Sequence, residues 1–282
     1  MHPRLLPHLL ILPAAVFTVV FFVYPMVLVS VAAFTDAGGA FTLKHFQTMF
    51  GHWKFGATLG NTLMFAALVV PIQLVVALCM AQMLTQVTRA RDMLLYLWTI
   101  PLGICDLAAG IVWLAIFEQT GFLNSLLVGL GLRAQPVSFL GYDDTFSLLV
   151  AIVLAEIWRS TGTVLVILAS GIGMIPREYR EAAEVFGAGP WQKFLRVTLP
   201  LLRPTLQTAL ILRTIFALEV FAVIVALSGT RFPVLMGEAY HWQFTLQDGA
   251  VASAMALVLL LLSALTTLFY LRVLRVPAGV RL

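Results

Sequence analysis

The sequence predicts an all-α, polytopic membrane protein with six transmembrane helices. The chain of 282 residues is 61% hydrophobic and only 11% charged, with a mean hydropathy of +0.99. Soluble domains carry about 25% charged residues. The apolar residues also gather in runs of roughly 20 residues or more, the length that a helix needs to cross the hydrocarbon core. A water-soluble fold of this size could not bury so much apolar surface.

Six runs are long enough to span a bilayer, and helices are expected for each. Lipid offers no hydrogen-bonding partner to the backbone, so every span must pair its own N–H and C=O groups. The predicted spans are Leu9–Phe34, Thr58–Leu84, Leu94–Phe117, Phe146–Ser170, Leu201–Ser228 and Gly249–Leu274. No internal repeat is visible, so residues 1–282 are expected to form a single transmembrane domain.

The distribution of Lys and Arg predicts the orientation of these spans. Eleven basic residues lie in the two termini and in the loops after the second and fourth spans, whereas four lie in the other loops. Because Lys and Arg are enriched in cytoplasmic loops, both termini and the loop at about 171–203 are expected in the cytoplasm. The net charge of +4 therefore indicates topology rather than nucleic-acid binding.

One charged segment, EAAEVFGAGPWQKFLRVTLP at residues 181–200, interrupts the apolar chain. An apolar stripe at the helical spacing i, i+3, i+4, i+7 consists of Tyr179, Ala182, Ala183 and Phe186. Gly187 and Pro190 then interrupt the helix. The segment predicts a short helix, a sharp elbow and a second helix. From these observations alone, an amphipathic connector resting on lipid headgroups is an alternative, whereas the surrounding spans disfavour a DNA-binding helix-turn-helix.

The wider stretch IPREYREAAEVFGAGPWQKFLRVTLPLLRPTL resembles the EAA loop of the permease subunits of binding-protein-dependent ABC importers, in particular the carbohydrate-uptake, maltose-transporter-like branch. The residues that match the family pattern are Glu181, Ala182, Ala183, Gly187, Ala188, Leu199 and Pro200. The resemblance implies the type I ABC importer permease fold and assigns ATPase coupling to these residues together with Phe186. At position 186 the chain departs from most carbohydrate permeases, which carry an Asp before the Gly-Ala pair.

The resemblance also implies partners. A second homologous permease, two copies of an ABC ATPase subunit and an extracytoplasmic solute-binding protein are expected, in the bacterial cytoplasmic (inner) membrane. The chain has no GxxxxGK[ST] phosphate loop, so ATP and Mg are expected on the separate ATPase chain, and this subunit is expected to bind no cofactor and to catalyse no reaction. A permease homodimer is the alternative to the heterodimer.

Ionisable side chains at membrane depth are costly and mark functional sites. Candidate residues for a substrate cavity are Asp106, Glu156, Arg159 and Glu219 with the aromatic side chains Trp113, Trp158 and Phe221. Glu156 and Arg159 can meet on one helix face, whereas Arg213 is expected to find partners on other helices. The alternative is that these charges only pair with one another or lie near a membrane edge.

A neutral sugar or polyol is the expected substrate, because such molecules are bound by planar and charged hydrogen-bonding groups, often beside aromatic rings. Arg159 and Arg213 leave an anionic sugar derivative, a phosphate or sulfonate, as an alternative. An ion-coupled secondary transporter is a further alternative, but it would show internal repeats and would leave the EAA loop unexplained. The histidines are scattered, so no metal site is expected.

Overall fold

The computed structural model describes residues 6–87, 89–141 and 144–274, which form helices joined by turns. The chain folds into two compact units. The first contains the chain through Leu59 together with Leu235–Leu262, and the second contains Gly60–Val234 and the chain from Ser263 onward. The predicted orientation was based in part on Arg4, Arg275 and Arg281. These three residues lie outside the described residues.

Within the described ranges, five helical stretches are long and apolar enough to cross a membrane. They are Leu10–Phe34, Phe55–Gln86, Asp106–Gly129, Thr145–Gly173 and Gly249–Val273. A sixth is present if Pro190–Leu201 and Arg203–Leu218, which are bent by 72° at a short break, are counted as one span. The all-α polytopic fold predicted from the sequence is confirmed.

The first unit begins with a span that is exposed among the residues that the structure describes. Its elements are α1 (Leu6–Thr18), the π-helical segment η1 (Val19–Val23), α2 (Tyr24–Phe34), α3 (Lys44–Gly51), the start of α4 (Phe55–Gln86), α14 (Leu235–Phe244) and the start of α15 (Gly249–Val273). In the apolar window within Leu10–Phe34, no residue is buried. These side chains therefore face lipid or another subunit.

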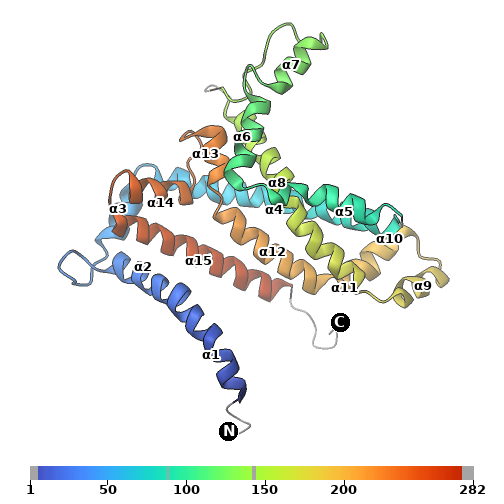
Figure 1. Cartoon of the computed structure of the whole chain (residues 1–282), viewed down its shortest axis with the longest axis horizontal. Coiled ribbons are helices and arrows are strands. Elements are labelled where there is room, and N and C mark those ends of the chain that lie inside the picture. Colours follow the sequence, from blue (N-terminus) through green and yellow to red (C-terminus); the bar gives the residue numbers. More distant parts are fainter. Residues whose placement is uncertain (1–5, 88, 142–143, 275–282) are drawn as a thin grey trace. The chain divides into compact units, whose positions relative to one another are not determined.

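The second unit is built around α8 (Thr145–Gly173). Its other elements are the rest of α4, α5 (Arg91–Thr99), the 3-10 turn η2 (Ile100–Gly103), α6 (Asp106–Phe117), α7 (Phe122–Gly129), α9 (Arg177–Val185), α10 (Pro190–Lys193), the π-helical η3 (Phe194–Thr198), α11 (Leu199–Leu201), α12 (Arg203–Leu218), α13 (Ala222–Ser228) and the end of α15. Helix α8 packs against α5, η2, α6, α12 and α13. The α6–α7 segment and the α9–α11 segment lie at opposite ends of α8 (Figure 1).

Two apolar clusters hold the second unit together. One includes Phe65, Ile152 and Ile224, from α4, α8 and α13. The other includes Leu165 and Leu202, from α8 and the start of the α12 region. Because lipid tails are as apolar as leucine, close packing rather than the removal of water stabilises such contacts in a membrane.

The prediction of one continuous third helix, Leu94–Phe117, is wrong. Helix α5 ends at Thr99, the 3-10 turn η2 follows, and α6 begins at Asp106. Pro101 lies in this turn, where it cannot supply the N–H that a continuing helix needs. The break allows η2 to approach α8 closely, since a Cβ on Gly162 would lie 3.0 Å from Cγ of Leu102.

The prediction of one continuous fifth helix, Leu201–Ser228, is also wrong. Helix α12 ends at Leu218, residues 219–221 are not helical, and α13 begins at Ala222. Helix α13 packs instead against α6, where a Cβ on Gly110 would lie 2.5 Å from that of Ala226. Residues 219–221 include no glycine or proline, so the local sequence carried no signal for this break.

Candidate functional site

A buried polar network joins α8 to α12 and α4. The side chain of Glu156 on α8 is fully buried. Its Oε1 atom accepts hydrogen bonds from Nη2 of Arg213 at 2.7 Å, from Nη2 of Arg159 at 2.9 Å and from Oγ of Ser160 at 2.8 Å. The expected pairing of Glu156 with Arg159 is present, and Arg213 finds its partners on other helices, as expected.

Arg213 extends the network to α4. Its side chain is only 3% exposed, and its Nε donates to Oε1 of Gln73. The amide nitrogen of Gln73 donates in turn to the backbone carbonyl of Glu156 at 2.8 Å. Among the described residues, Nη1 of Arg213 is buried and has no hydrogen-bond partner. A buried donor without a partner costs about 1–3 kcal/mol, so this atom is a candidate to bind a ligand hydroxyl or water.

The network forms one wall of a cavity of about 280 Å³. The polar residues that line it are Asp106, Arg159, Ser160, Thr163, Arg213 and Glu219. Nη1 of Arg159 lies 2.7 Å from Oδ1 of Asp106, whose side chain is half exposed. Leu212 and Phe216 on α12 supply apolar surface. A cavity with convergent polar groups and an apolar wall is typical of small-molecule sites.

Both helix interruptions border this cavity. Asp106 is the first residue of α6, where the partial positive charge of the helix N-terminus stabilises a carboxylate. Glu219 and Val220 directly follow the end of α12. Irregular backbone at membrane depth is tolerated only where it is buried in protein or lines a polar cavity. The two breaks thus support the assignment of this space as functional.

The sequence-predicted candidates do not all reach the cavity. Asp106, Arg159 and Glu219 line it, and Glu156 lies behind them as the shared acceptor. Trp113, Trp158 and Phe221 are not among the lining residues. The rings of Trp113 and Trp158 lie 6.0 Å apart, edge to face, and Trp113 packs against the apolar cluster around Ile152.

Sequence reasoning missed the aromatic ring and the amide that the structure brings to this site. Phe216 lines the cavity and is 49% exposed, but nothing in the sequence distinguishes it from the many lipid-facing phenylalanines. Gln73 is uncharged, so it did not stand out within a long apolar run. Ser160 lies four residues after Glu156, and Thr163 lies four residues after Arg159. This helical spacing is the signal that could have identified them.

Acids outnumber arginines at the cavity and in the network behind it, three to two. Arg159 and Arg213 are each paired with carboxylates, those of Glu156 and Asp106. Glu219 adds a further acid at the cavity, with no ion pair among the residues that the structure describes. The two arginines therefore do not create an excess of positive charge.

The predicted helix, elbow and second helix are present after α8. Helix α9 ends in a Schellman motif, in which the amide of Gly187 donates to the carbonyl of Glu184 and the amide of Ala188 donates to that of Ala183, both at 2.9 Å. Gly187 has φ +76°, and a Cβ built on it would meet nothing within 4 Å. The left-handed backbone angle, rather than a clash, therefore makes glycine the suitable residue.

A salt bridge braces the two sides of the elbow. Nζ of Lys193 on α10 lies 2.6 Å from Oε1 of Glu184 on α9. The hydrogen bond and the charge of Lys193 lower the pKa of the Glu184 carboxyl below its ordinary value. Stability from this pair is present above the unfolded-state pKa and is lost as the pH falls through the folded-state pKa. The brace is therefore intact at neutral pH.

The elbow presents apolar side chains outward. Val185 is 86% exposed and Phe186 is 90% exposed. On α9, Glu181 and Ala182 are exposed and Ala183 is half-buried. Leu199 and Pro200 are half-buried and directly precede the 72° bend into α12. Large apolar side chains that are this exposed indicate a surface for another protein or for lipid.

The helical spans, the polar cavity within them and the exposed elbow define a membrane permease subunit. The chain belongs to the family of binding-protein-dependent transport system inner membrane components, whose model matches residues 73–275.

Individual relatives cover nearly the whole chain. The trehalose/maltose transport system permease protein MalF of Thermococcus litoralis is 29% identical, across 95% of this chain and 93% of its own length. The sulfoquinovosyl glycerol transport system permease protein SmoG of Agrobacterium fabrum is 30% identical, across 96% and 91%. A chain of the bacterial ABC transporter that imports the acidic polysaccharide alginate superposes with a TM-score of 0.84 at 23% identity, covering 96% and 95%. That structural likeness supports the fold alone.

Proposed function

We propose that this chain and a second, homologous permease form the translocation path of an ATP-driven type I importer for a neutral sugar or polyol. An extracytoplasmic binding protein delivers the solute, and two copies of a separate ATPase subunit bind ATP and Mg. The observation that carries the proposal is the exposed elbow, in which Val185 and Phe186 have no cover within the described chain.

The elbow is suited to dock on an ATPase subunit. Gly187 fixes the turn, and the Lys193–Glu184 pair holds α9 against the following helix. Both features make the segment rigid, so that displacement of α9 by a partner carries η3 with it. Ala182 and Ala183 keep one face of α9 shallow, which allows close approach to a groove.

Helix α12 connects the elbow to the cavity. It follows the Pro190–Leu201 segment after a 72° bend, carries Arg213, and ends at Leu218, directly before Glu219. Its 16 residues span about 24 Å at 1.5 Å per residue. Movement of the docked elbow therefore tilts or shifts α12 and changes the width of the cavity. In this mechanism the Glu156–Arg213 pair is the contact between α12 and α8 that resists or transmits the shift.

The lack of excess positive charge at the cavity favours a neutral substrate over an anion. Arg159 and Arg213 are both occupied by carboxylates, and Glu219 would repel a phosphate or sulfonate. Hydroxyl groups can exchange hydrogen bonds with Asp106, Glu219 and the free Nη1 of Arg213, while a sugar ring face contacts Phe216. The relatives include a transporter named for trehalose and maltose and one named for a sulfonated glycoside. Similarity to these relatives therefore does not distinguish a neutral substrate from an anionic one.

The orientation follows the basic residues. We propose that both termini and the 171–203 segment lie in the cytoplasm, because five of the basic residues of this chain lie in that segment. The docking elbow is then on the side where ATP is available.

Purification of an affinity-tagged chain from its native cells tests the proposal. The expected result is co-purification of a second permease and an ATPase, with ATP hydrolysis stimulated by a binding protein loaded with a neutral sugar. Recovery of the chain as an active transporter without any ATPase would contradict it. A homodimer would be recognised by the absence of a second permease from an otherwise complete complex.

A further inference from the structure

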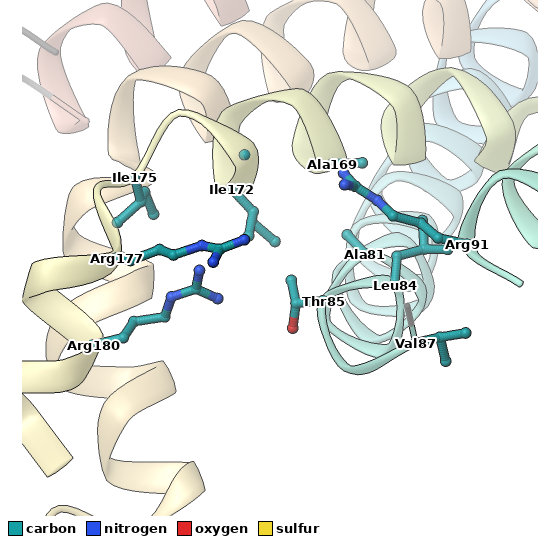
Figure 2. Close-up of a pocket in the computed structure, with 11 residues that line it drawn as sticks. Ala81, Leu84, Thr85, Val87, Arg91, Ala169, Ile172, Ile175, Arg177 and Arg180 are labelled. Carbon is teal, nitrogen blue, oxygen red and sulfur yellow. The ribbon is translucent and has the colours of Figure 1, made fainter. Parts of the chain in front are cut away.

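Three arginines surround a second cavity, of about 330 Å³, at the ends of α4 and α8. Arg177 and Arg180 come from α9, and Arg91 is the first residue of α5. In Figure 2 the side chains of Arg177 and Arg180 point toward one another and into the space beside Thr85, while Arg91 enters from the opposite side. The arginines thus converge from two helices that are far apart in the sequence.

No acidic residue lines this cavity, and none forms an ion pair with the three arginines within the part of the chain that the structure describes. The acids in the first turns of α5 and α9, Asp92 and Glu178, are not lining residues. Guanidinium groups remain charged at any physiological pH and repel one another. Their convergence around a space that no acidic residue lines therefore indicates a site for an anion.

The helix ends add to the positive potential. Arg91 and Arg177 are each the first residue of a nine-residue helix. The N-terminus of a helix already carries a partial positive charge, so a cation there is unfavourable and an anion is favoured. Two helix N-termini and three guanidinium groups therefore add positive potential to this one space.

Apolar side chains lie beside the arginines around the cavity (Figure 2). They are Ala81 and Leu84 near the end of α4, and Ile172 and Ile175 at and beyond the end of α8. Helices α4 and α8 are both candidate spans, and they end at Gln86 and Gly173. The cavity therefore lies at the ends of two candidate spans and combines apolar surface with charge.

We propose that this cavity binds the phosphate headgroup of an anionic phospholipid. Each arginine can donate two parallel hydrogen bonds to a pair of phosphate oxygens. The apolar lining residues contact the glycerol and the first carbons of the acyl chains. The volume is in the lower part of the range for small-molecule sites, roughly 300–1,000 Å³. The proposed orientation places the site in the cytoplasmic leaflet, where anionic lipids attract basic segments.

The site has a consequence for coupling, which rests on the proposed docking of α9. A phosphate held by Arg177 and Arg180 on α9 and by Arg91 on α5 would tie α9 to the ends of α4 and α8. The lipid would then set the resting position of the elbow. A transporter in a membrane without anionic lipid would be expected to hydrolyse ATP with weaker dependence on its binding protein.

Lipid retention tests the binding itself without any transport assay. The chain, purified within its complex, is exchanged into nanodiscs of phosphatidylcholine with and without phosphatidylglycerol, and bound lipid is measured by native mass spectrometry. The variants are Arg91→Gln and the double variant Arg177→Gln with Arg180→Gln. Arg196→Gln is the matched control, because Arg196 is exposed in the same segment but does not line the cavity.

Retention of phosphatidylglycerol is expected to fall roughly fivefold for each arginine removed and to be unchanged in Arg196→Gln. Equal retention by the wild type and both arginine variants would overturn the proposal.

Loss of ATPase binding by the α9 double variant, with lipid retention intact in all variants, would instead assign Arg177 and Arg180 to the ATPase interface. Inorganic phosphate is added in a parallel arm of the experiment. If the complex binds phosphate but shows no preference for phosphatidylglycerol, the ligand of this site is a soluble anion and the lipid proposal is wrong. None of these outcomes depends on the chain being a sugar permease.

Discussion

Arg213 on α12 and Glu156 on α8 form an ion pair of 2.7 Å in which both side chains are buried. Their sequence positions differ by 57, and the pair links α8 to α12, which both line the cavity. Arg159 and Gln73 complete the network from α8 and α4. Because the cavity lies directly beside this network, the stability of the permease and the shape of its proposed substrate site depend on the same side chains.

Replacing Glu156 by alanine is expected to destabilise the permease strongly, because Arg213 would be left buried without a counterion. Breaking such a pair from one side costs about 3–5 kcal/mol in soluble proteins. Glu156→Gln should be milder, since the amide oxygen still accepts a hydrogen bond. Thermal unfolding in detergent, followed by size-exclusion chromatography, measures the difference. Equal unfolding temperatures for the alanine variant and the wild type would contradict the structural role of the pair.

Filling the cavity is expected to block transport without uncoupling the ATPase. Thr163→Trp adds an indole at a lining position of α8, and uptake of the neutral substrate should fall by about tenfold or more. Leu154→Trp is the matched control, because Leu154 is exposed on the same helix and does not line the cavity. Uptake into proteoliposomes is the measurement. Normal uptake by Thr163→Trp would remove this space from the translocation path.

The elbow is expected to tolerate asparagine at position 187 and to reject valine. A β-branched residue at φ +76° is strained by about 1–2 kcal/mol, whereas asparagine enters the left-handed region more readily. Gly187→Val should therefore leave the permease in the membrane but abolish ATP-dependent uptake, and Gly187→Asn should retain most of it. A blot for the permease accompanies the uptake assay. Full transport by the valine variant would show that the turn has no coupling role.

The proposed topology predicts which cysteines an impermeant thiol reagent reaches in intact cells. In a background with Cys79 and Cys105 replaced by alanine, Trp53→Cys in the loop before α4 should react from outside. Glu184→Cys on α9 should react only after the cells are opened. Labelling of position 184 from outside would reverse the orientation that the basic residues predict.

The sequence predicted those features that depend on composition and local chemistry. The long apolar runs identified the spans, and the Gly-Pro punctuation near Gly187 identified the elbow. The break at residues 219–221 could not be predicted, because no local residue disfavours a helix there and the cause is packing of α13 on α6. The convergence of Arg91 and Arg177 on one cavity could not be predicted either, because segments that are distant in the sequence come together only when the spans assemble.

The candidate cavity was predicted in part, for a related physical reason. Charged side chains inside a span are conspicuous, so Asp106, Arg159 and Glu219 could be selected from the sequence alone. The choice between aromatic rings requires knowledge of which helix face meets the cavity. Sequence proximity to the charges favoured Trp113 and Trp158, whereas Phe216 is the ring that the fold brings to the site.

The central claim is that the exposed elbow docks on the ATPase subunit, and a photo-crosslink from position 186 tests it most directly. A photoreactive phenylalanine analogue takes the place of Phe186, and the same analogue at Phe122 on α7 serves as the control, since both side chains are exposed. Irradiation of the assembled transporter should join position 186 to the ATPase chain, and position 122 should give no such adduct. A complex that assembles and transports normally, yet yields no ATPase adduct from position 186, would contradict the account.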